Sequence, residues 1–326
     1  ILHLLYARFY HKLLRDEGLV NSNEPFKSLL CQGMVLAESF YKQIDGRKIW
    51  LAPSEVTVER DEKGRTIKAT ETTSGDTVNS GGITKMSKSK NNGVDPQTAI
   101  DKQGADTVRL FTMFAAPPEQ TLEWSDEGLS GAHRFLRKLW KMVHEHLEAN
   151  VIAPLDIASL SQQQTDLRRK THETINKVND DFGRRNTFNT AIAAVMELLN
   201  DVAKHSGTES QSIAVRHEAL TSAILLLSPI APHICHALWQ ALGYSESVAE
   251  ASWPSVDEQA LVRSTITLVL QVNGKVRGKI EVAADISKQN IENIALADEN
   301  VQRFIEGNTI RKIIVVPGRL INIVAN

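Results

Sequence analysis

The sequence has few cysteines, no long apolar run and no excess of charge of one sign. Its 326 residues include only Cys31 and Cys235, too few for a disulfide framework or a cysteine-rich zinc site. No 18-residue apolar run predicts a membrane-spanning helix. The 37 Lys and Arg nearly balance the 39 Asp and Glu, so the overall charge does not indicate nucleic acid. We expect a cytoplasmic protein without a membrane partner, with both cysteines as small core residues.

The pattern of residues in the first part of the chain predicts an α/β layer. Residues 1–17 have the period of an amphipathic helix. Residues 29–36 are apolar on both faces, as in a buried strand of a parallel sheet. The helical pattern begins at Ile1 without an N-cap residue, and we therefore expect the chain to be part of a longer protein.

Short strands and then helices follow. Residues 45–84 predict a small β insertion with strands at 50–51, 56–59 and 65–69 and a turn at 61–64. Asp95-Pro96 is a typical helix start, with Asp as N-cap and Pro at the first helical position.

The rest of the chain predicts a bundle and a small α/β domain. Apolar residues recur at helical spacing in four long segments, which indicate a bundle. These segments are 128–148, 162–182, 187–205 and 212–242. Beyond them, Asn273-Gly274 is a favoured hairpin turn. Strands at 266–272, 276–282, 313–316 and 320–324, with a helical stretch at 287–305, predict a ββαββ domain.

Residues 81–93 combine three lysines, two serines and three glycines. Ammonium groups, hydroxyls and backbone amides together provide many donors for phosphate oxygens. A solvated basic loop is the alternative interpretation. The segment is not a Walker loop, because no Gly-Lys-Ser/Thr follows a strand.

The string Lys85-Met-Ser-Lys-Ser89 resembles the KMSKS signature of class I aminoacyl-tRNA synthetases. Further segments resemble the branched-aliphatic subgroup of that family, namely 104–110, 122–125, 231–234 and 253–254. Within the subgroup, the β insertion before the signature and residues 271–277 resemble the bacterial leucyl-tRNA synthetases. Isoleucyl or valyl relatives, and a stand-alone tRNA-binding module, are the alternatives.

This resemblance implies a multidomain α/β and mainly α protein. The implied domains are the C-terminal part of a Rossmann-type catalytic domain (1–44), a leucine-specific β insertion (45–84), a KMSKS loop and stem-contact region (85–127), an anticodon-binding type of helical bundle (128–262) and a C-terminal α/β tRNA-binding domain (263–326). The implied enzyme is a monomer that uses ATP and Mg²⁺ to activate leucine and transfers it to tRNA(Leu). The His-Ile-Gly-His motif and the editing domain do not occur in this chain, so we expect it to be inactive by itself.

The resemblance also implies roles for individual residues. Lys85 and Lys88 would stabilise the charge that develops on ATP during catalysis. The implied ATP-binding residues are Lys85, Met86, Ser87, Lys88, Ser89, Gln32, Gly33, Met34 and Val35. His3 would line the leucine pocket. A plain core strand at 32–35 and a structural role for His3 are the alternatives.

Basic residues outside this loop are candidates for tRNA contacts. Residues 263–326 contain nine Lys and Arg against six Asp and Glu. Lys275, Arg277 and Lys279 alternate along one predicted strand and would share a face suited to phosphates. Ordinary solvated lysines are the alternative. Weaker candidates are Arg134, Arg137 and Lys138, which follow helical spacing, and Arg184 and Arg185, which lie between two predicted bundle helices. No metal site is expected, because His144 and His146 do not share a helix face.

Overall fold

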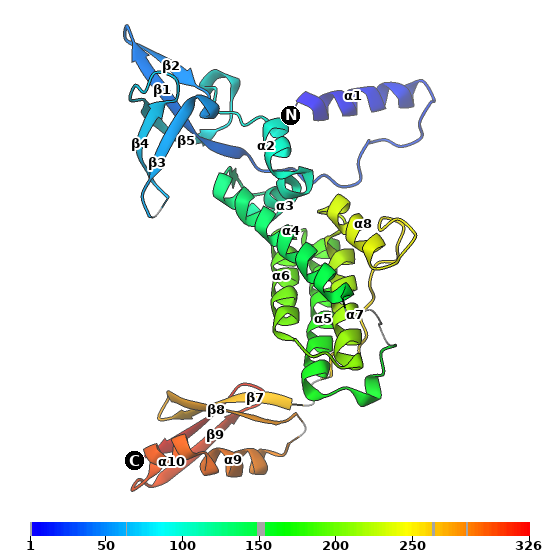
Figure 1. The fold of residues 1–326 in the computed structure, drawn as a ribbon, viewed down its shortest axis with the longest axis vertical. Helices are drawn as coiled ribbons and strands as arrows, with labels where there is room; N and C mark the ends of the chain where they lie inside the picture. Colours follow the sequence, from blue (N-terminus) through cyan, green and yellow to red (C-terminus); the bar gives the residue numbers. More distant parts are fainter. Residues whose placement is uncertain (1, 63, 149–153, 263–264, 285) are drawn as a thin grey trace. The chain divides into compact units, whose positions relative to one another are not determined.

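The computed structural model describes residues 2–62, 64–148, 154–262, 265–284 and 286–326. The chain divides into two compact units, one ending at Val256 and the other formed by Asp257–Asn326 (Figure 1). Ile1 of the first predicted helix lies outside the described residues. So do Arg263 and Asp285, which belong to the basic and acidic residues counted over 263–326. Over the ranges just given, no helix combines the length and the apolar character needed to cross a membrane.

A four-stranded sheet in the first unit is built around one long strand. This strand, β1 (Val35–Ile44), pairs antiparallel with β2 (Arg47–Leu51) and with β5 (Asn79–Lys85). Its first two residues pair in parallel with β6 (Leu122–Glu123).

The predicted short strands of the insertion are confirmed. β3 (Val56–Arg60) and β4 (Thr66–Glu71) form an antiparallel hairpin of their own, and a short 3₁₀ turn, η1 (Pro53–Glu55), precedes β3. The predicted turn at 61–64 includes Lys63, which lies outside the described residues. Its two ends are joined, because the amide of Gly64 donates to the carbonyl of Asp61.

The prediction of a buried strand over 29–36 is wrong for residues 29–34, because β1 begins only at Val35. Leu29 and Leu30 are 56% and 45% exposed, and Cys31 is exposed rather than in the core. An apolar segment becomes a buried strand only where other strands pair with it and other layers cover it. No strand within the described ranges pairs with 29–34.

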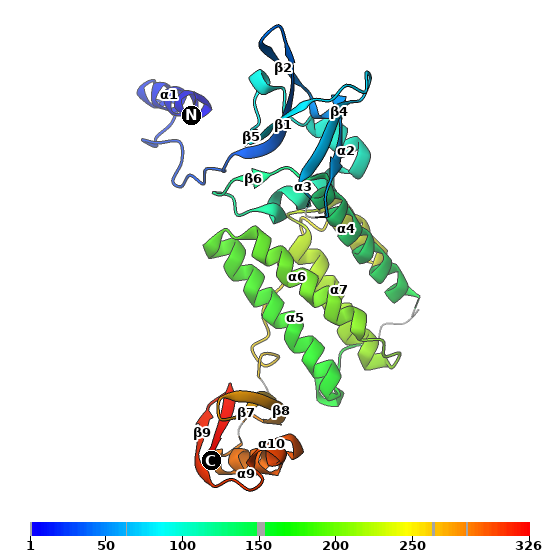
Figure 2. The same cartoon turned by 90° about the vertical axis from the view of Figure 1, so that its left-hand side faces the viewer.

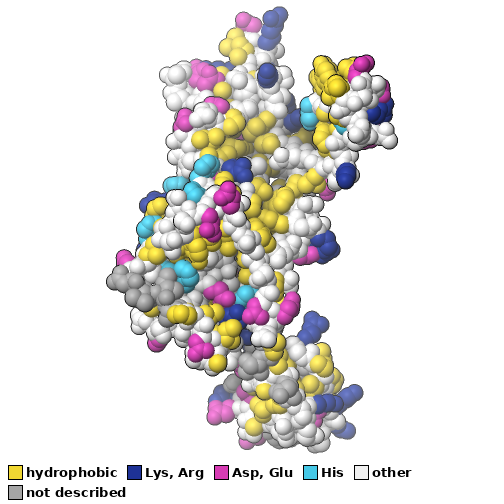
Figure 3. Space-filling model, turned by 90° about the vertical axis from the view of Figure 1, so that its right-hand side faces the viewer, with side chains coloured by type: hydrophobic (Ala, Val, Ile, Leu, Met, Phe, Trp, Pro, Cys, Tyr) yellow, Lys and Arg dark blue, Asp and Glu magenta, His cyan; other side chains and the backbone are white. Residues whose placement is uncertain are grey.

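The predicted first helix is present, but its apolar face is not covered. α1 (Leu2–Asp16) contains no buried residue, and Phe9 is 62% exposed. Figure 3 shows hydrophobic side chains, in yellow, gathered in patches on the face of the molecule that it draws. The amphipathic period therefore predicts the helix correctly, although among the described residues nothing buries its apolar side.

Two short helices follow the sheet, and the first begins where Asp95-Pro96 predicts a helix start. Asp95 caps α2 (Pro96–Gln103) by accepting hydrogen bonds from the amides of Gln97 and Thr98. Gly104 has a φ of 86°, a left-handed value that suits glycine, and separates α2 from α3 (Ala105–Ala115).

Over the described residues, the helical bundle contains five helices where four segments were predicted. They are α4 (Asp126–Leu147), α5 (Gln162–Asp180), α6 (Phe188–Lys204), α7 (Ser210–Leu227) and α8 (Pro232–Ala241). The segment 212–242 is divided because prolines at 229 and 232 lack the amide hydrogen that a continuous helix needs. Cys235 is buried in the core, as predicted.

The core of the bundle lies between long helices that run side by side. Figure 2 shows α5, α6 and α7 in this arrangement. The fully buried side chains include Leu139, Ile175, Ile192, Leu199, Ile224 and Leu238. α5 continues into a π-helical turn, η4 (Asp181–Arg185), and a 3₁₀ turn, η3 (Ile157–Ser159), precedes α5.

The second unit has the predicted ββαββ order. Its strands are β7 (Thr265–Val272), β8 (Lys275–Ala283), β9 (Ile310–Val316) and β10 (Leu320–Ala325), arranged in the sheet as β8-β7-β10-β9. The helical stretch consists of α9 (Lys288–Ala297) and α10 (Glu299–Ile305). Asn273 and Gly274 have φ values of 50° and 77°, as the predicted two-residue turn requires.

Candidate functional site

The lysine loop (Lys85–Asn92) leaves the end of β5 and forms one tight turn. The amide of Met86 donates to the carbonyl of Val35 at 3.0 Å, which continues the pairing of β5 with β1. Ser87 then caps the 3₁₀ turn η2 (Lys88–Lys90), and its Oγ accepts a hydrogen bond from the Lys90 amide at 3.3 Å. The sheet therefore fixes the position at which the loop begins.

Asn92 is buried beneath this loop, with 0% exposure. Its Oδ1 accepts a hydrogen bond from the Ser87 amide at 2.9 Å. Its Nδ2 donates to the carbonyls of Ala37 at 3.2 Å and Thr84 at 3.3 Å. One side chain thus joins the loop to β1 and β5. No local pattern in the sequence reveals this role, because the contact joins segments far apart in the chain.

The loop presents exposed ammonium groups. Lys85 and Lys88 are exposed, and neither forms an ion pair with any residue the structure describes. The hydroxyls of Ser87 and Ser89 lie 3.2 Å apart. Lys90 differs from the other two lysines, because its Nζ lies 5.6 Å from the centroid of the Trp50 ring. Free ammonium and hydroxyl donors together suit a phosphate chain.

The predicted ATP-binding residues 32–35 are only partly brought to the loop. Val35 lies beside Met86, whereas Gln32 and Met34 are exposed and precede the strand. Gly33 packs tightly, because a Cβ at this position would lie 1.9 Å from the carbonyl oxygen of Gln120. A glycine within an apolar run is the signal that could have predicted this close approach.

His3 lies on α1 and is exposed. No hydrogen bond joins it to the lysine loop within the described part of the chain. Its predicted place in a leucine pocket stays a prediction.

The basic residues of α4 are not equivalent. Arg134 and Arg137 are exposed. The Nζ of Lys138 donates to the Asn200 side chain on α6 at 2.7 Å. The two arginines are therefore the freer candidates for RNA phosphates.

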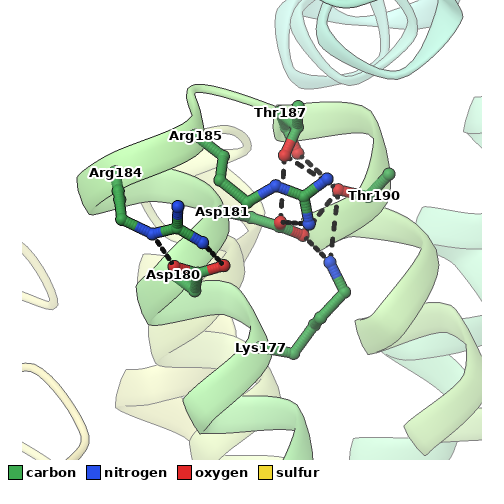
Figure 4. A network of polar contacts seen from close by, with 7 residues as sticks. All are labelled: Lys177, Asp180, Asp181, Arg184, Arg185, Thr187 and Thr190. Atoms are coloured by element: carbon green, nitrogen blue, oxygen red, sulfur yellow. Dashed lines mark hydrogen bonds and ion pairs between the residues drawn. The ribbon is translucent and has the colours of Figure 1, made fainter.

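Arg184 and Arg185 belong to an internal network of polar contacts (Figure 4). Arg184 pairs with Asp180 at 2.6 Å, and Arg185 pairs with Asp181 at 3.2 Å. Asp181 is fully buried. Burial raises the pKa of Asp181, but hydrogen bonds from Lys177 and from two threonine hydroxyls outweigh that effect and hold the pKa below its usual range. Both arginines thus already bind carboxylates within the bundle.

The prediction that Lys275, Arg277 and Lys279 share one face of β8 is wrong. Lys275 pairs with the buried Val272, whereas Lys279 pairs with Val269. A register shift leaves Arg277 without a partner, as in a β-bulge. Because paired side chains lie on the same face, Lys275 and Lys279 point to opposite faces of the sheet.

Arg277 is also occupied inside the second unit. Its guanidinium carbon lies 3.5 Å from the centroid of the Phe304 ring on α10. Such a cation–π contact anchors the arginine side chain on the helix. The role of these three residues in RNA binding stays a prediction.

His144 and His146 have separate environments, as predicted. His144 stacks on Trp140, with 4.4 Å between the ring centroids. His146 is buried, and its Nε2 lies 3.3 Å from Nδ1 of His217. Burial, with smaller contributions from His217 and Arg216, lowers the pKa of His146 to about 4. Over the residues the structure describes, no three His, Cys, Asp or Glu side chains are placed to hold a metal ion.

Two family profiles and a solved structure match this chain. The profile described as "tRNA synthetases class I (I, L, M and V)" matches residues 72–125, which include the lysine loop. The profile described as "Anticodon-binding domain of tRNA ligase" matches residues 164–292. A solved structure from Agrobacterium radiobacter K84, a ternary LeuRS–tRNA–LeuAMS complex, is 26% identical with a TM-score of 0.67, and the match covers 100% of this chain and 37% of that one.

Individual relatives extend the match to the whole chain. The leucine–tRNA ligases of Marinobacter nauticus and Cellvibrio japonicus are 65% and 63% identical over 100% of this chain. The chain spans 38% of the length of each, and the matched part is their C-terminal part. The resemblance seen in the sequence is confirmed: over its whole length the chain is similar to the C-terminal part of leucine–tRNA ligases, and it matches a class I tRNA synthetase profile.

Proposed function

We propose that this chain carries the ATP-binding loop and tRNA-contacting parts of a leucine–tRNA ligase. The whole enzyme activates leucine with ATP and transfers the leucyl group to tRNA(Leu). The observation that carries the proposal is the pair of unneutralised lysines, Lys85 and Lys88, on a loop anchored by the buried Asn92. The sequence identity of 65% and 63% to two leucine–tRNA ligases supports leucine over isoleucine or valine as the substrate.

The loop acts on the phosphates during formation of leucyl-adenylate. A carboxylate oxygen of leucine forms a bond to the α-phosphorus of ATP. The bond from that phosphorus to the bridging oxygen breaks, and pyrophosphate leaves with the electron pair. Lys85 and Lys88 stabilise the negative charge that builds on the departing phosphates. Ser87 and Ser89 provide further donors.

The residues of the loop fit ATP phosphates but not a metal ion. Class I synthetases in general use Mg²⁺ with ATP. Residues 85–93 contain no carboxylate. The next one, Asp95, caps α2, with its two oxygens 3.2 and 3.3 Å from the helix amides. We therefore assign no Mg²⁺ ligand to this chain, and phosphate oxygens would hold the ion.

The adenosine of ATP, leucine and tRNA are each assigned to residues outside the lysine loop. We assign the adenosine to residues 32–35, where Val35 adjoins the loop, and leucine to His3. Arg134 and Arg137 on the bundle, with Lys275, Arg277 and Lys279 in the second unit, are assigned to tRNA. The anticodon-binding profile supports the RNA role of the bundle. The enzyme is proposed to act in the cytoplasm as a monomer, and this chain to be inactive by itself.

Leucine-dependent exchange of pyrophosphate into ATP by the full-length ligase tests the central assignment. Lys88→Ala is expected to lower the rate by about a hundredfold or more, because one donor to the transition state is lost. Lys102→Ala removes another exposed lysine, on α2, and should leave the rate near that of the unmodified enzyme. Exchange by Lys88→Ala at the unmodified rate would overturn the proposal, and exchange driven better by isoleucine or valine would replace leucine as the substrate.

A further inference from the structure

A pocket in the first unit shares no residue with the lysine loop. Its volume is about 480 Å³, and it lies between the α2–α3 junction, α4 and the start of α8. The residues that matter for its chemistry are Asp106, His133, Leu136, Arg137, Trp140 and His233. Arg137 aside, none of these six residues has a role in the proposed function.

One wall of the pocket is a single face of α4. His133, Arg137 and Trp140 follow one another at helical spacings of four and three, so they lie on the same side of the helix. Trp140 is 42% exposed, and its ring is held by stacking on His144 with 25° between the two planes. A rigid, partly exposed indole beside an apolar hollow is a suitable surface for a flat aromatic ligand.

The same helix places positively charged side chains around the pocket. Between residues 128 and 144, α4 contains Arg134, Arg137, Lys138 and Lys141 and no Asp or Glu. Lys138 is hydrogen-bonded to Asn200, and Lys141 lies 3.4 Å from Glu145. Arg137 forms no ion pair with any described residue and lines the pocket. Its planar guanidinium is a donor suited to a phosphate group.

The opposite wall contributes the imidazole of His233, which Asp106 holds in one orientation. Nδ1 of His233 lies 2.8 Å from Oδ1 of Asp106, and the other oxygen of Asp106 accepts from the Ile234 amide at 2.7 Å. An ionised carboxylate only accepts hydrogen bonds, so Nδ1 of His233 donates. The Nε2 of the neutral ring is then an acceptor, which can take a hydrogen bond from a hydroxyl or from an amino group of a base.

We propose that this pocket binds one unpaired nucleotide of an RNA. Its base stacks on Trp140, its phosphate pairs with Arg137, and its 2′-hydroxyl or base amino group donates to His233. Stacking on an aromatic ring together with phosphate pairing is the usual way in which proteins hold unpaired nucleotides. The inference rests on the proposed function, because it gives the tRNA of that proposal a specific point of contact.

Binding of a fluorescently labelled tRNA(Leu) transcript to this chain, followed by anisotropy, tests the proposal. Trp140→Ala is expected to weaken binding about tenfold, because base stacking is lost. Trp140→Phe keeps an aromatic face and should stay within about threefold of the unmodified chain. Arg137→Ala should weaken binding several-fold and reduce the slope of log affinity against log salt by about one. Lys141→Ala removes the same charge from the same helix outside the pocket and should change affinity less than about twofold.

A fully paired RNA duplex separates the pocket from general attraction to phosphates. Trp140→Ala should leave affinity for the duplex unchanged, because a paired base cannot enter the pocket. If the unmodified chain binds tRNA and the Trp140 and Arg137 variants bind it equally well, the pocket assignment is overturned while the proposed function stands. If the unmodified chain binds no RNA, both the pocket and the tRNA-contacting role are overturned. Thermal unfolding of each variant confirms that its fold is intact.

Discussion

The side-chain amide of Asn92 lies 3.2 Å from the carbonyl oxygen of Ala37, 55 residues earlier in the chain. The oxygen of the same amide accepts a hydrogen bond from the Ser87 backbone. Because Asn92 is fully buried, water cannot replace these bonds. Leaving a buried polar group without a partner costs about 1–3 kcal/mol. The geometry of the lysine loop therefore depends on the asparagine at its end.

Asn92→Ala is expected to increase hydrogen exchange at the Ser87 amide. The substitution removes the acceptor of that amide and leaves the sheet pairing of Met86 in place. Amide exchange followed by NMR or mass spectrometry measures the effect. Ser89→Ala, which alters a nearby hydroxyl contact, serves as the control and should leave Ser87 protected. Equal exchange at Ser87 in both variants would show that Asn92 does not anchor the loop.

Gly33→Ala is expected to destabilise the first unit by about 1–3 kcal/mol, the usual cost of overpacking. The added Cβ would lie 1.9 Å from the carbonyl oxygen of Gln120, so the backbone must move. The free energy of unfolding in urea measures this cost. Gly93→Ala is the matched control, because a Cβ there has no heavy atom within 4 Å. A loss no larger than that of Gly93→Ala would contradict the close packing of the segment before β1.

Arg277→Ala is expected to reduce the stability of the second unit by about 1 kcal/mol, the usual size of a cation–π contact. Lys279→Ala removes an equal charge from the same strand without a ring contact and should have little effect. Amide exchange of the paired strands β7 and β8 gives the free energy of opening for each variant. If both variants lost the same stability, the contact with Phe304 would contribute nothing.

The bundle is expected to lose stability as the pH falls from about 7 toward 4. Burial, with smaller contributions from His217 and Arg216, lowers the pKa of His146 to about 4, whereas an unfolded histidine has a pKa near 6.5. Between these values the unfolded chain binds a proton that the folded chain does not, so acid favours unfolding. Urea unfolding at about pH 7 and about pH 5 measures the difference. His146→Phe should reduce it, whereas His144→Phe, at an exposed position, should not.

Local signals in the sequence predict much of the fold correctly. Asp95-Pro96 predicts the start of α2, and Asn273-Gly274 predicts the hairpin of the second unit, because caps and turns depend on adjacent residues. Other features depend on residues far apart in the chain. The bulge at Arg277 follows from the pairing register of β8 with β7, and alternation along one strand does not reveal it.

The candidate site is predictable to the same extent. The signature makes Lys85 and Lys88 the candidate ATP-binding lysines, since their spacing is local, and that role stays a prediction. The anchoring by Asn92 and the pocket at Trp140 need segments brought together by folding. The apolar residues of 29–34 predict burial, but apolar composition cannot show which partners are present to cover them.

The dependence of the ATP-binding lysines on Asn92 is tested most directly by the rate of leucyl-adenylate formation in a single turnover of the full-length ligase. The variants are Lys88→Ala, Asn92→Ala and the combination of the two. If Asn92 acts by holding the lysines of the loop against ATP, its substitution matters little once Lys88 is gone. Adding Asn92→Ala to Lys88→Ala is therefore expected to slow the reaction much less than Asn92→Ala slows it in the unmodified enzyme. If the fold-reductions in rate of the two single variants instead multiplied in the double variant, Asn92 would not act through Lys88.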